Sequence, residues 1–586
     1  MNSETRKCQN CKSDFVIEPD DFKFYEKISV PPPTFCPECR LQRRLAFRNE
    51  RNLYRRNCNL CGRDIVSMWQ KNVPFPVYCQ ECWWSDKWDG IGFGREFDES
   101  KSFLEQFAEL QKLIPRPQYF NYESARLVRS PYANCSGDLE DCYLVFATQY
   151  SRNCAYTHYL NNGKDSFDML YSDKAERCYD SQDIENCYNV SFSVSSSNCV
   201  DSMFLFDCKN CNDCLGCSGL RNKKYHILNK PFSKEEYEKK KKELKLNTSA
   251  GVAEFRKKFF DEIYYNTPRK YYHGQMNSNF SGDYISNTEN TFEGFYTKNT
   301  RNVKYSFWCL GGDDVYDYFA WGDLHKSYEV VSSGDNSFNI KFTYGCWGGS
   351  RNIEYSTYCI SCNDLFGCVG LRHKKFSILN KQYSEDEYYK LREKIIKQMT
   401  EKSYVAKDGI QYKYGEFFPI ELSIMFYNET VAEEHFPLTQ EEALAKGYLW
   451  NEGERGSYVA SKKGTELPQS ISDVGDDILN EVIECRVCKR PYRIIEPELK
   501  FYKEMDLPLP QLCPDSRHLE RIKLRNPLKL WKRKCECNSK KAKIVYQNTA
   551  VHEHGESECL NEFETSYAPE RPEIVYCEQC YLKEVV

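Results

Sequence analysis

Pairs of cysteines separated by two residues occur four times in the first 90 residues. Zinc takes about four soft ligands in a tetrahedron, and each Cys-x-x-Cys pair supplies half of them from one tight turn. The spacing therefore predicts two structural zinc sites, formed by Cys8, Cys11, Cys36 and Cys39 and by Cys58, Cys61, Cys79 and Cys82. Both sets are complete, so neither leaves the open position that a catalytic zinc needs. Because "CPEC" leads directly into "RLQRRLAF", the last ligand of the first site is expected at a helix start, as in a treble clef.

The chain closes on a second copy of this module. The first three cysteines recur 477 positions later as Cys485, Cys488 and Cys513. Ser516 stands where the fourth cysteine is expected, and His518 is predicted to replace it as the ligand. The alternative for this site is that it is empty and held by its hydrophobic surroundings.

The second site of the closing module is predicted from a C-x-C and a Cys-x-x-Cys pair. Its expected ligands are Cys535, Cys537, Cys577 and Cys580. An insertion between the two pairs carries His552, His554 and Cys559, which we interpret as loop residues in preference to a further metal site. The whole chain is therefore expected to hold three to four structural zinc ions.

Basic residues follow the zinc ligands in both modules. The predicted nucleic-acid contacts of the opening module are Arg40, Arg43, Arg44, Arg48, Arg51, Arg55 and Arg56. Those of the closing module are Arg521, Lys523, Arg525, Lys532 and Arg533. Guanidinium groups suit phosphate oxygens, so these two arginine strips predict contact with the backbone of RNA or DNA. The alternative is a helix face that is solvated or packs against the neighbouring zinc site.

The totals limit the class of protein. The chain has 586 residues, enough for several domains, and a net charge of −5, so any basic surface must be local. No stretch approaches the length of about 18 apolar residues that a membrane span needs, and the N-terminus lacks the apolar core of a signal peptide. We therefore expect a cytoplasmic protein without a membrane partner, whose 31 cysteines are thiols and metal ligands.

The middle of the chain is also duplicated. A segment that begins at Cys211 returns at Cys362, 151 positions later, and each copy ends in a helix with an S-x-x-E capping box. Ahead of these helices, small residues recur 12 positions apart, as at Val303, Val315 and Ser327. Such a rhythm indicates a stacked β-repeat, and two beats suggest a solenoid coil of 21 to 24 residues. The alternative is two compact antiparallel sheets.

The cysteine run "CKNCNDCLGC", from Cys208 to Cys217, resembles a cluster-binding motif. The second copy has Leu365 where the first has Cys214, so we interpret the run as small buried thiols in stacked turns.

These features predict a multidomain, mainly β protein: zinc-ribbon or treble-clef modules at both ends flank two duplicated, solenoid-like β-repeat domains, each followed by an α-helix. The expected boundaries are 1–90 for the first paired zinc module, 91–130 for a linker and helix, 131–248 and 249–403 for the repeat domains, 404–480 for a helical segment with a polar linker, and 481–586 for the second, partly degraded zinc module.

Motifs of known catalytic sites are missing from the sequence. It has no Gly-rich phosphate loop, nucleophile elbow or H-E-x-x-H. His158 and His226 are interpreted as structural residues. Carboxylates are numerous on the repeats, but their number does not show that any two of them are placed for catalysis.

The segments "PPPTFCPECRLQRRLAFRNERNLYRR", "VYCQECWWSDKWD", "GCVGLRHKKFSILNKQYS", "FPLTQEEALAKGY" and "NEFETSYAPERPEIVYCEQCY" sample nearly the full length of the chain. In these segments it resembles a zinc-ribbon family of candidate-phylum bacteria that has no established activity. The resemblance implies zinc modules. Members sometimes carry a CaiB/BaiF-type CoA-transferase label, but this sequence shows neither a dinucleotide-type fold pattern nor a catalytic aspartate in a recognisable context.

The leading interpretation is a non-enzymatic zinc scaffold that contacts nucleic acid or a ribonucleoprotein through the arginine strips and a second partner through the repeat faces. One alternative is an enzyme on the repeat domains, acting on a glycan or acyl substrate, which would need a cleft with convergent carboxylates or a histidine. The other is a purely protein-binding adaptor, which differs from the leading interpretation only in what contacts the arginines.

Overall fold

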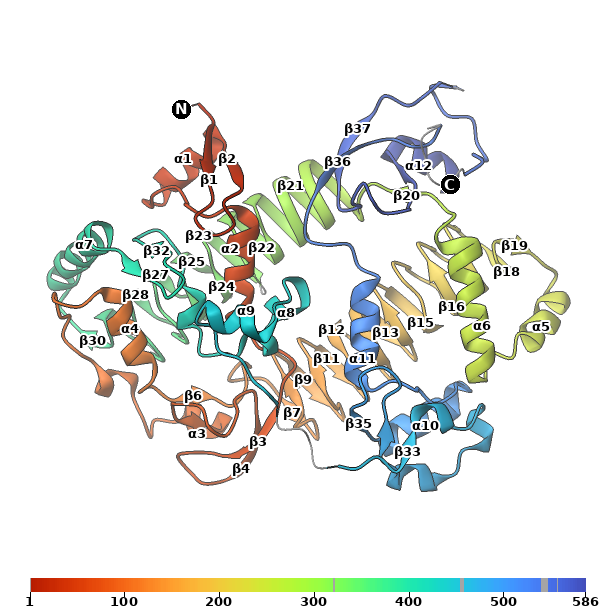
Figure 1. The fold of residues 1–586 in the computed structure, drawn as a ribbon, viewed down its shortest axis with the longest axis horizontal. Coiled ribbons are helices and arrows are strands. Elements are labelled where there is room, and N and C mark those ends of the chain that lie inside the picture. Colours follow the sequence, from red (N-terminus) through yellow and green to blue (C-terminus); the bar gives the residue numbers. More distant parts are fainter. Residues whose placement is uncertain (1, 320–321, 454–457, 539–545, 556, 586) are drawn as a thin grey trace.

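The computed structural model describes residues 2–319, 322–453, 458–538, 546–555 and 557–585. Part of the predicted polar linker and part of the insertion after Cys537 lie outside the described residues. The chain is largely β, with two large sheets side by side and a smaller cysteine-containing module in front of each (Figure 1). Within the described residues, no helix is both long and apolar enough to cross a bilayer.

The first large sheet lies in residues 127–231. Its strands are β7 (Leu127–Val128), β8 (Ala133–Asn134), β9 (Gly137–Glu140), β10 (Val145–Phe146), β11 (Gln149–Arg152), β12 (His158–Asn161), β13 (Phe167–Glu176), β14 (Tyr179–Gln182), β15 (Glu185–Ser191), β16 (Val200–Phe206), β17 (Asn212–Ser218), β18 (Lys224–Ile227) and β19 (Lys230–Pro231).

The second large sheet lies in residues 274–382. Its strands are β21 (Gly274–Lys304), β22 (Phe307–Tyr316), β23 (Gly322–Tyr328), β25 (Ser337–Lys341), β27 (Arg351–Glu354), β28 (Asn363–Phe366), β29 (Lys375–Ile378) and β30 (Lys381–Gln382). A short pair, β24 (Val331–Ser333) and β26 (Tyr344–Cys346), lies beside it.

Neighbouring strands in both sheets are parallel, except for an antiparallel hairpin that closes each sheet at β18–β19 and β29–β30. Paired residues stand 12 positions apart, as in the pairing of Val303 with Val315 and of Val315 with Ser327. The step widens to 13 positions between β23, β25 and β27. Neighbouring strands are therefore offset by a single 12-residue interval. The expected coil length of 21 to 24 residues, which assumed two such intervals, was wrong. The alternative of antiparallel sheets was also wrong.

The backbone of the repeats turns at regular intervals. In the first sheet φ is positive at every third residue from Cys135 to Leu228, for example at Leu144, Ala147 and Tyr150. The left-handed region is costly for residues other than glycine, asparagine and aspartate, so the stacked neighbours must hold these turns in place.

Small cysteine side chains occupy part of the core of the first sheet, beside larger side chains such as Leu139 and Met169. Cys208, Cys211, Cys214 and Cys217 are at most 1 % exposed. Each sulfur lies within hydrogen-bonding distance of the backbone carbonyl two positions earlier and of the one nine positions later, as Cys208 does of Phe206 and Cys217, and its S–H can donate to either. These thiols therefore satisfy local backbone acceptors, in accord with the interpretation as buried small residues.

A helix follows each large sheet. Ser233 and Glu236 form the predicted capping box at the start of α5 (Lys234–Glu243), and Ser384 and Glu387 form the one at α7 (Glu385–Glu401). The other helices are α1 (Pro19–Lys27), α2 (Pro37–Leu45), α3 (Gln80–Trp84), α4 (Phe103–Gln111), α6 (Ser249–Phe259), α8 (Val431–His435), α9 (Gln440–Ala445), α10 (Glu496–Met505), α11 (Pro514–Lys523) and α12 (Glu578–Val585).

Each end module is built from small hairpins and short helices. The remaining strands are β1 (Glu4–Lys7), β2 (Asp14–Ile17), β3 (Tyr54–Asn57), β4 (Asp64–Ser67), β5 (Val77–Tyr78), β6 (Arg116–Pro117), β20 (Arg269–Lys270), β31 (Tyr404–Val405), β32 (Gln411–Tyr412), β33 (Lys462–Lys463), β34 (Ile483–Glu484), β35 (Pro491–Tyr492), β36 (Trp531–Lys534), β37 (Glu562–Thr565) and β38 (Val575–Tyr576).

The end modules dock on the sheets in crossed order. Helices α1 and α2 of the opening module lie against the second sheet, and α10 and α11 of the closing module lie against the first (Figure 1). The ring of Phe24 stacks on Tyr316 with centroids 3.7 Å apart, and Phe501, its counterpart 477 positions later, stacks on Phe167 at 4.3 Å. Phe167 and Tyr316 are themselves 149 positions apart in the two sheets, so both junctions use the same contact.

Candidate metal centres and the docking arginines

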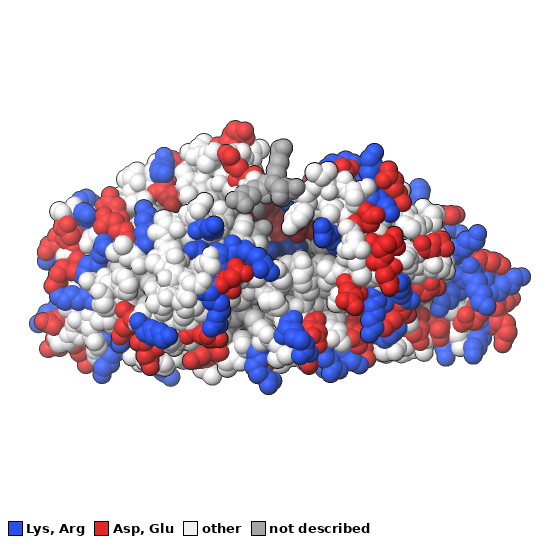
Figure 2. Space-filling model, turned by 90° about the horizontal axis from the view of Figure 1, so that it is seen from below, with Lys and Arg blue, Asp and Glu red and all other residues white. Residues whose placement is uncertain are grey.

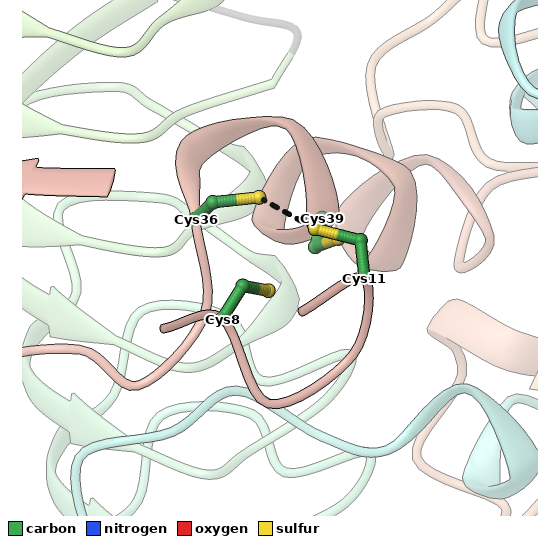
Figure 3. Close-up of side chains that lie close together, drawn as sticks. All are labelled: Cys8, Cys11, Cys36 and Cys39. Carbon is green, nitrogen blue, oxygen red and sulfur yellow. Dashed lines mark hydrogen bonds between the residues drawn. The ribbon is translucent and has the colours of Figure 1, made fainter. Parts of the chain in front are cut away.

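The first predicted zinc site is assembled as the sequence indicated. Cys8 and Cys11 lie in the loop after β1, while Cys36 caps helix α2 and Cys39 lies in its first turn (Figure 3). The four sulfur atoms lie within 4.8 Å of one another, and those of Cys11 and Cys36 are 3.7 Å apart. Tetrahedral zinc with bonds of about 2.3 Å to sulfur needs sulfur atoms about 3.8 Å apart, which is close to the spacing of this group.

The second site has the same form. Its sulfur atoms lie within 4.8 Å of one another, and those of Cys61 and Cys79 are 3.8 Å apart. Cys79 caps helix α3, so this site also ends at a helix start. Both groups therefore fit the four-cysteine metal sites that the sequence predicts.

The third site has three cysteines. The sulfur atoms of Cys485, Cys488 and Cys513 form one group, and those of Cys488 and Cys513 are 3.5 Å apart. The hydroxyl oxygen of Ser516 lies 3.4 Å from the sulfur atoms of Cys485 and Cys513, in the place of the fourth ligand. The prediction that His518 supplies this ligand was wrong. Its Nε2 pairs with Glu434 at 3.0 Å, because two further residues along α11 turn its side chain to another side of the helix.

The fourth site holds more candidate ligands than the sequence predicted. Cys535, Cys537 and Cys580 lie together as expected, and the peptide N–H of Cys577 donates to the sulfur of Cys535 at 3.2 Å. Cys559 joins this group, and a second group of ligand atoms consists of Cys537, His552, His554 and Cys580. Cys559 and both histidines lie in loops, as expected, and they also lie among the candidate ligands. Their spacing fits no short motif, and only the three-dimensional structure shows that they lie beside the cysteines.

Most arginines of the two strips are buried. Arg40, Arg43, Arg44, Arg48, Arg56, Arg521 and Arg525 are at most 9 % exposed, and the side chain of Arg533 is 8 % exposed. Arg51 is 16 % exposed and pairs with Asp515. The side chains of Arg55 and Lys523 are more than half exposed, and Lys532 also faces solvent. The prediction that the strips bind nucleic acid was wrong for the buried arginines, because their guanidinium groups are enclosed within the protein.

Carboxylates of the second sheet and of the segment that follows it pair with the opening strip. Nε of Arg40 lies 2.8 Å from Asp317, and Nη1 of Arg44 lies 2.9 Å from the same carboxylate. Arg43 pairs with Glu329 at 2.6 Å and with Glu416 at 3.1 Å. Burial alone would lower the pKa of Arg43, but the two glutamate charges outweigh burial and hold it above its usual range. The arginine strip of α2 thus joins the module to the sheet.

The closing module repeats this junction on the first sheet. Arg517 and Arg521, the counterparts of Arg40 and Arg44, both lie 3.1 Å from Asp168, which stands 149 positions before Asp317. Arg521 also pairs with Asp180 at 2.8 Å. Burial would raise the pKa of Asp180, but the charges of Arg256 and Arg521 outweigh it and lower the pKa.

Comparison with known proteins gives no family to this chain: neither a protein-family model nor a curated protein sequence matches it.

Removal of one docking charge should weaken a junction. In Asp168→Asn the two arginines lose a shared anion that is 0 % exposed, so we expect the free energy of unfolding to fall by about 3–5 kcal/mol. Asp138→Asn is the matched control, because Asp138 also has a positive φ but pairs on the surface with Arg126, whose side chain is 80 % exposed. Its cost should be about 0–1 kcal/mol. Urea titration measures both, and equal losses would contradict a docking role.

A fourth thiolate should strengthen the third site. In Ser516→Cys the new sulfur replaces a hydroxyl that already lies 3.4 Å from two ligand sulfurs. We expect about one further zinc ion per chain to survive competition by a coloured chelator. Ser516→Ala should give no gain. An unchanged amount of resistant zinc in Ser516→Cys would show that this group does not coordinate the ion.

Proposed function

We propose that this protein is a non-enzymatic, zinc-dependent scaffold for a protein partner. The observation that carries the proposal is the burial of the arginine strips in ion pairs with the two sheets. The treble-clef-like modules then have a structural role within the protein. Zinc stabilises the fold of each module, and the helix of the module binds one sheet through its ion pairs. Of the interpretations drawn from the sequence, the protein-binding adaptor fits this arrangement best.

We infer that each large sheet is one side of a narrow solenoid with a 12-residue coil. Parallel pairing at 12 positions and a turn at every third residue support four short sides per coil. Such a stack leaves its outer surface in solvent, where the side chains of Tyr150 and Tyr188 are 66 % and 43 % exposed. Tyrosine is enriched at protein interfaces, so this surface is suitable for a protein partner.

The surface charges also favour a protein over a nucleic acid. On the face shown in Figure 2, lysine and arginine side chains are interspersed with aspartate and glutamate over most of the area. A nucleic-acid surface concentrates positive charge so that several phosphates are neutralised together. The basic residues of the strips that face solvent are Arg55, Lys523 and Lys532, and they come from different elements.

Fluorescence anisotropy with a generic RNA and a duplex DNA tests the choice of partner. At about 150 mM salt we expect no saturable binding by the zinc-loaded protein, because most strip arginines already have protein partners. A variant with Arg55, Lys523 and Lys532 changed to serine should behave like the wild type across the salt series. Binding that weakens steeply with salt, and less steeply in the variant, would restore nucleic acid as the partner.

A second function is favoured by a cleft of about 160 Å³ where four parts of the chain meet. Its lining includes Glu50 from the loop after α2, His158 from β12, Glu434 from α8 and His518 from α11. Nε2 of His158 lies 2.5 Å from Glu50, Nε2 of His518 lies 3.0 Å from Glu434, and the two rings have centroids 5.3 Å apart.

Both imidazoles of the cleft have the form of a positioned base. The carboxylate partner fixes the orientation of each ring, and each Nδ1 is buried without a hydrogen-bond partner among the described residues. Histidines oriented in this way can transfer protons to a bound substrate. Arg51 and Arg490 also line the cleft and can attract a negative group. The cleft thus favours an enzyme whose site lies between four segments of the chain, and not on the repeat domains alone as the sequence analysis expected.

Hydrolysis of an activated acyl ester, p-nitrophenyl acetate, tests this second function. If the cleft performs acid–base chemistry, His158→Gln and His518→Gln should each lower the rate by about 100-fold. His226→Gln is the control, because His226 bonds to the carbonyl of Lys224 outside the cleft. Equal rates in all three variants and the wild type would exclude catalysis by these histidines.

A further inference from the structure

Seven candidate metal ligands lie at the fourth site of the chain, in the closing module. They are Cys535, Cys537, Cys559, Cys577, Cys580, His552 and His554. A tetrahedral zinc ion takes about four ligands, so a single ion would leave three candidate ligands without a metal. The excess needs an explanation, because the two sites of the opening module are each built from four cysteines.

The ligand atoms fall into two groups that share one edge. Cys535 and Cys559 belong to one group, His552 and His554 belong to the other, and Cys537 and Cys580 belong to both. The two shared sulfur atoms are 3.5 Å apart. Nε2 of His554 lies 3.2 Å from the sulfur of Cys537 and 3.4 Å from that of Cys580. On the other side, the sulfur of Cys559 lies 3.9 Å from that of Cys580. These distances suit the edges of two tetrahedra.

His552 is prepared as a ligand by its surroundings. It is 4 % exposed, and its Nε2 pairs with Glu584 at 2.8 Å. Glu584 is itself held by the N–H and hydroxyl of Thr549, each at 2.8 Å. Nδ1 of His552 is buried without a hydrogen-bond partner among the described residues. A carboxylate behind one imidazole nitrogen, with the other nitrogen free, is the usual arrangement around a metal-bound histidine.

We propose that the closing module binds a pair of zinc ions bridged by the thiolates of Cys537 and Cys580. Cys535 and Cys559 complete the first tetrahedron, and His552 and His554 complete the second. Two ions that share two thiolates need six ligands, which matches the two groups. Cys577 stays beside the pair, where its sulfur accepts a hydrogen bond from Nδ2 of Asn561 at 3.3 Å. Thiolate and imidazole ligands in tetrahedral positions favour zinc.

The pair deepens the proposed scaffold, since it rests on the end modules being zinc sites. The insertion between Cys537 and Cys559 then contributes His552 and His554 as ligands of the second ion. The same module also joins strand β38 to β20, which follows the helices of the first sheet, so the metal pair would stabilise this attachment.

Metal analysis of the full chain tests the pair. Counted with the three other sites, we expect about five zinc ions per chain in native mass spectrometry. The double variant His552→Ala/His554→Ala should lose about one ion, whereas Cys537→Ser, at a bridging position, should lose about two. His226→Gln is the control and should lose none. Equal losses in the histidine and Cys537 variants would overturn the pair.

A second measurement does not depend on whether the variants fold. After exchange of zinc for ¹¹³Cd in the wild-type chain, two ions that share thiolates are coupled through sulfur, so their resonances split each other. Unsplit resonances throughout would overturn the pair. Four ions without splitting would leave the scaffold proposal intact, whereas a chain that binds no zinc at its opening module would refute the scaffold itself.

Discussion

Two buried junctions between arginine and aspartate determine how this molecule is assembled. At each junction two guanidinium groups from one turn of a helix share a single carboxylate of a sheet, Asp317 or Asp168, and both carboxylates are 0 % exposed. A charge taken out of water is costly unless it is paired. Neither the helix nor the sheet could therefore keep its buried charges without the other. A metal ion that holds the module together would thus also stabilise the sheet on which the helix docks.

The crossed order of docking spreads this dependence over the whole chain. The opening module clamps the second sheet and the closing module clamps the first, so each sheet relies on a module far away in the sequence. The segment between the second sheet and the closing module takes part as well. Its Glu416 pairs with Arg43, and its Glu434 pairs with His518. The cleft of His158 and His518 lies where the opening module, the first sheet, the segment after the second sheet and the closing module meet. For this reason no local sequence motif predicts it.

Local patterns in the sequence were sufficient for some features and not for others. Cysteine spacing predicts the zinc groups because ligands two residues apart share one turn. The 12-residue beat predicts stacking, but the length of a turn depends on positive φ at residues such as Leu144 and Tyr150, which carry no turn signature. The fate of the arginines depends on partners far away in sequence: Asp317 is 277 residues from Arg40, and Asp168 is 349 residues from Arg517. The sequence of a basic strip is the same whether its arginines pair with phosphate groups or with carboxylates of a sheet that is distant in the sequence.

A comparison of the two copies within the chain shows which contacts constrain a module most. Phe24, Arg40 and Arg44 return as Phe501, Arg517 and Arg521, with the same kind of partner in the other sheet. Asp21 returns as Glu498, and each accepts a hydrogen bond from a sheet tyrosine, Tyr305 or Tyr156. The metal ligands differ more, since Cys39 is replaced by Ser516. A fourth zinc ligand can be supplied by a hydroxyl, a water molecule or a histidine, whereas a buried guanidinium pair has no comparable substitute for its carboxylate. The shared carboxylate and its two arginines therefore stay the same in both copies, although Arg43 beside them returns as Glu520.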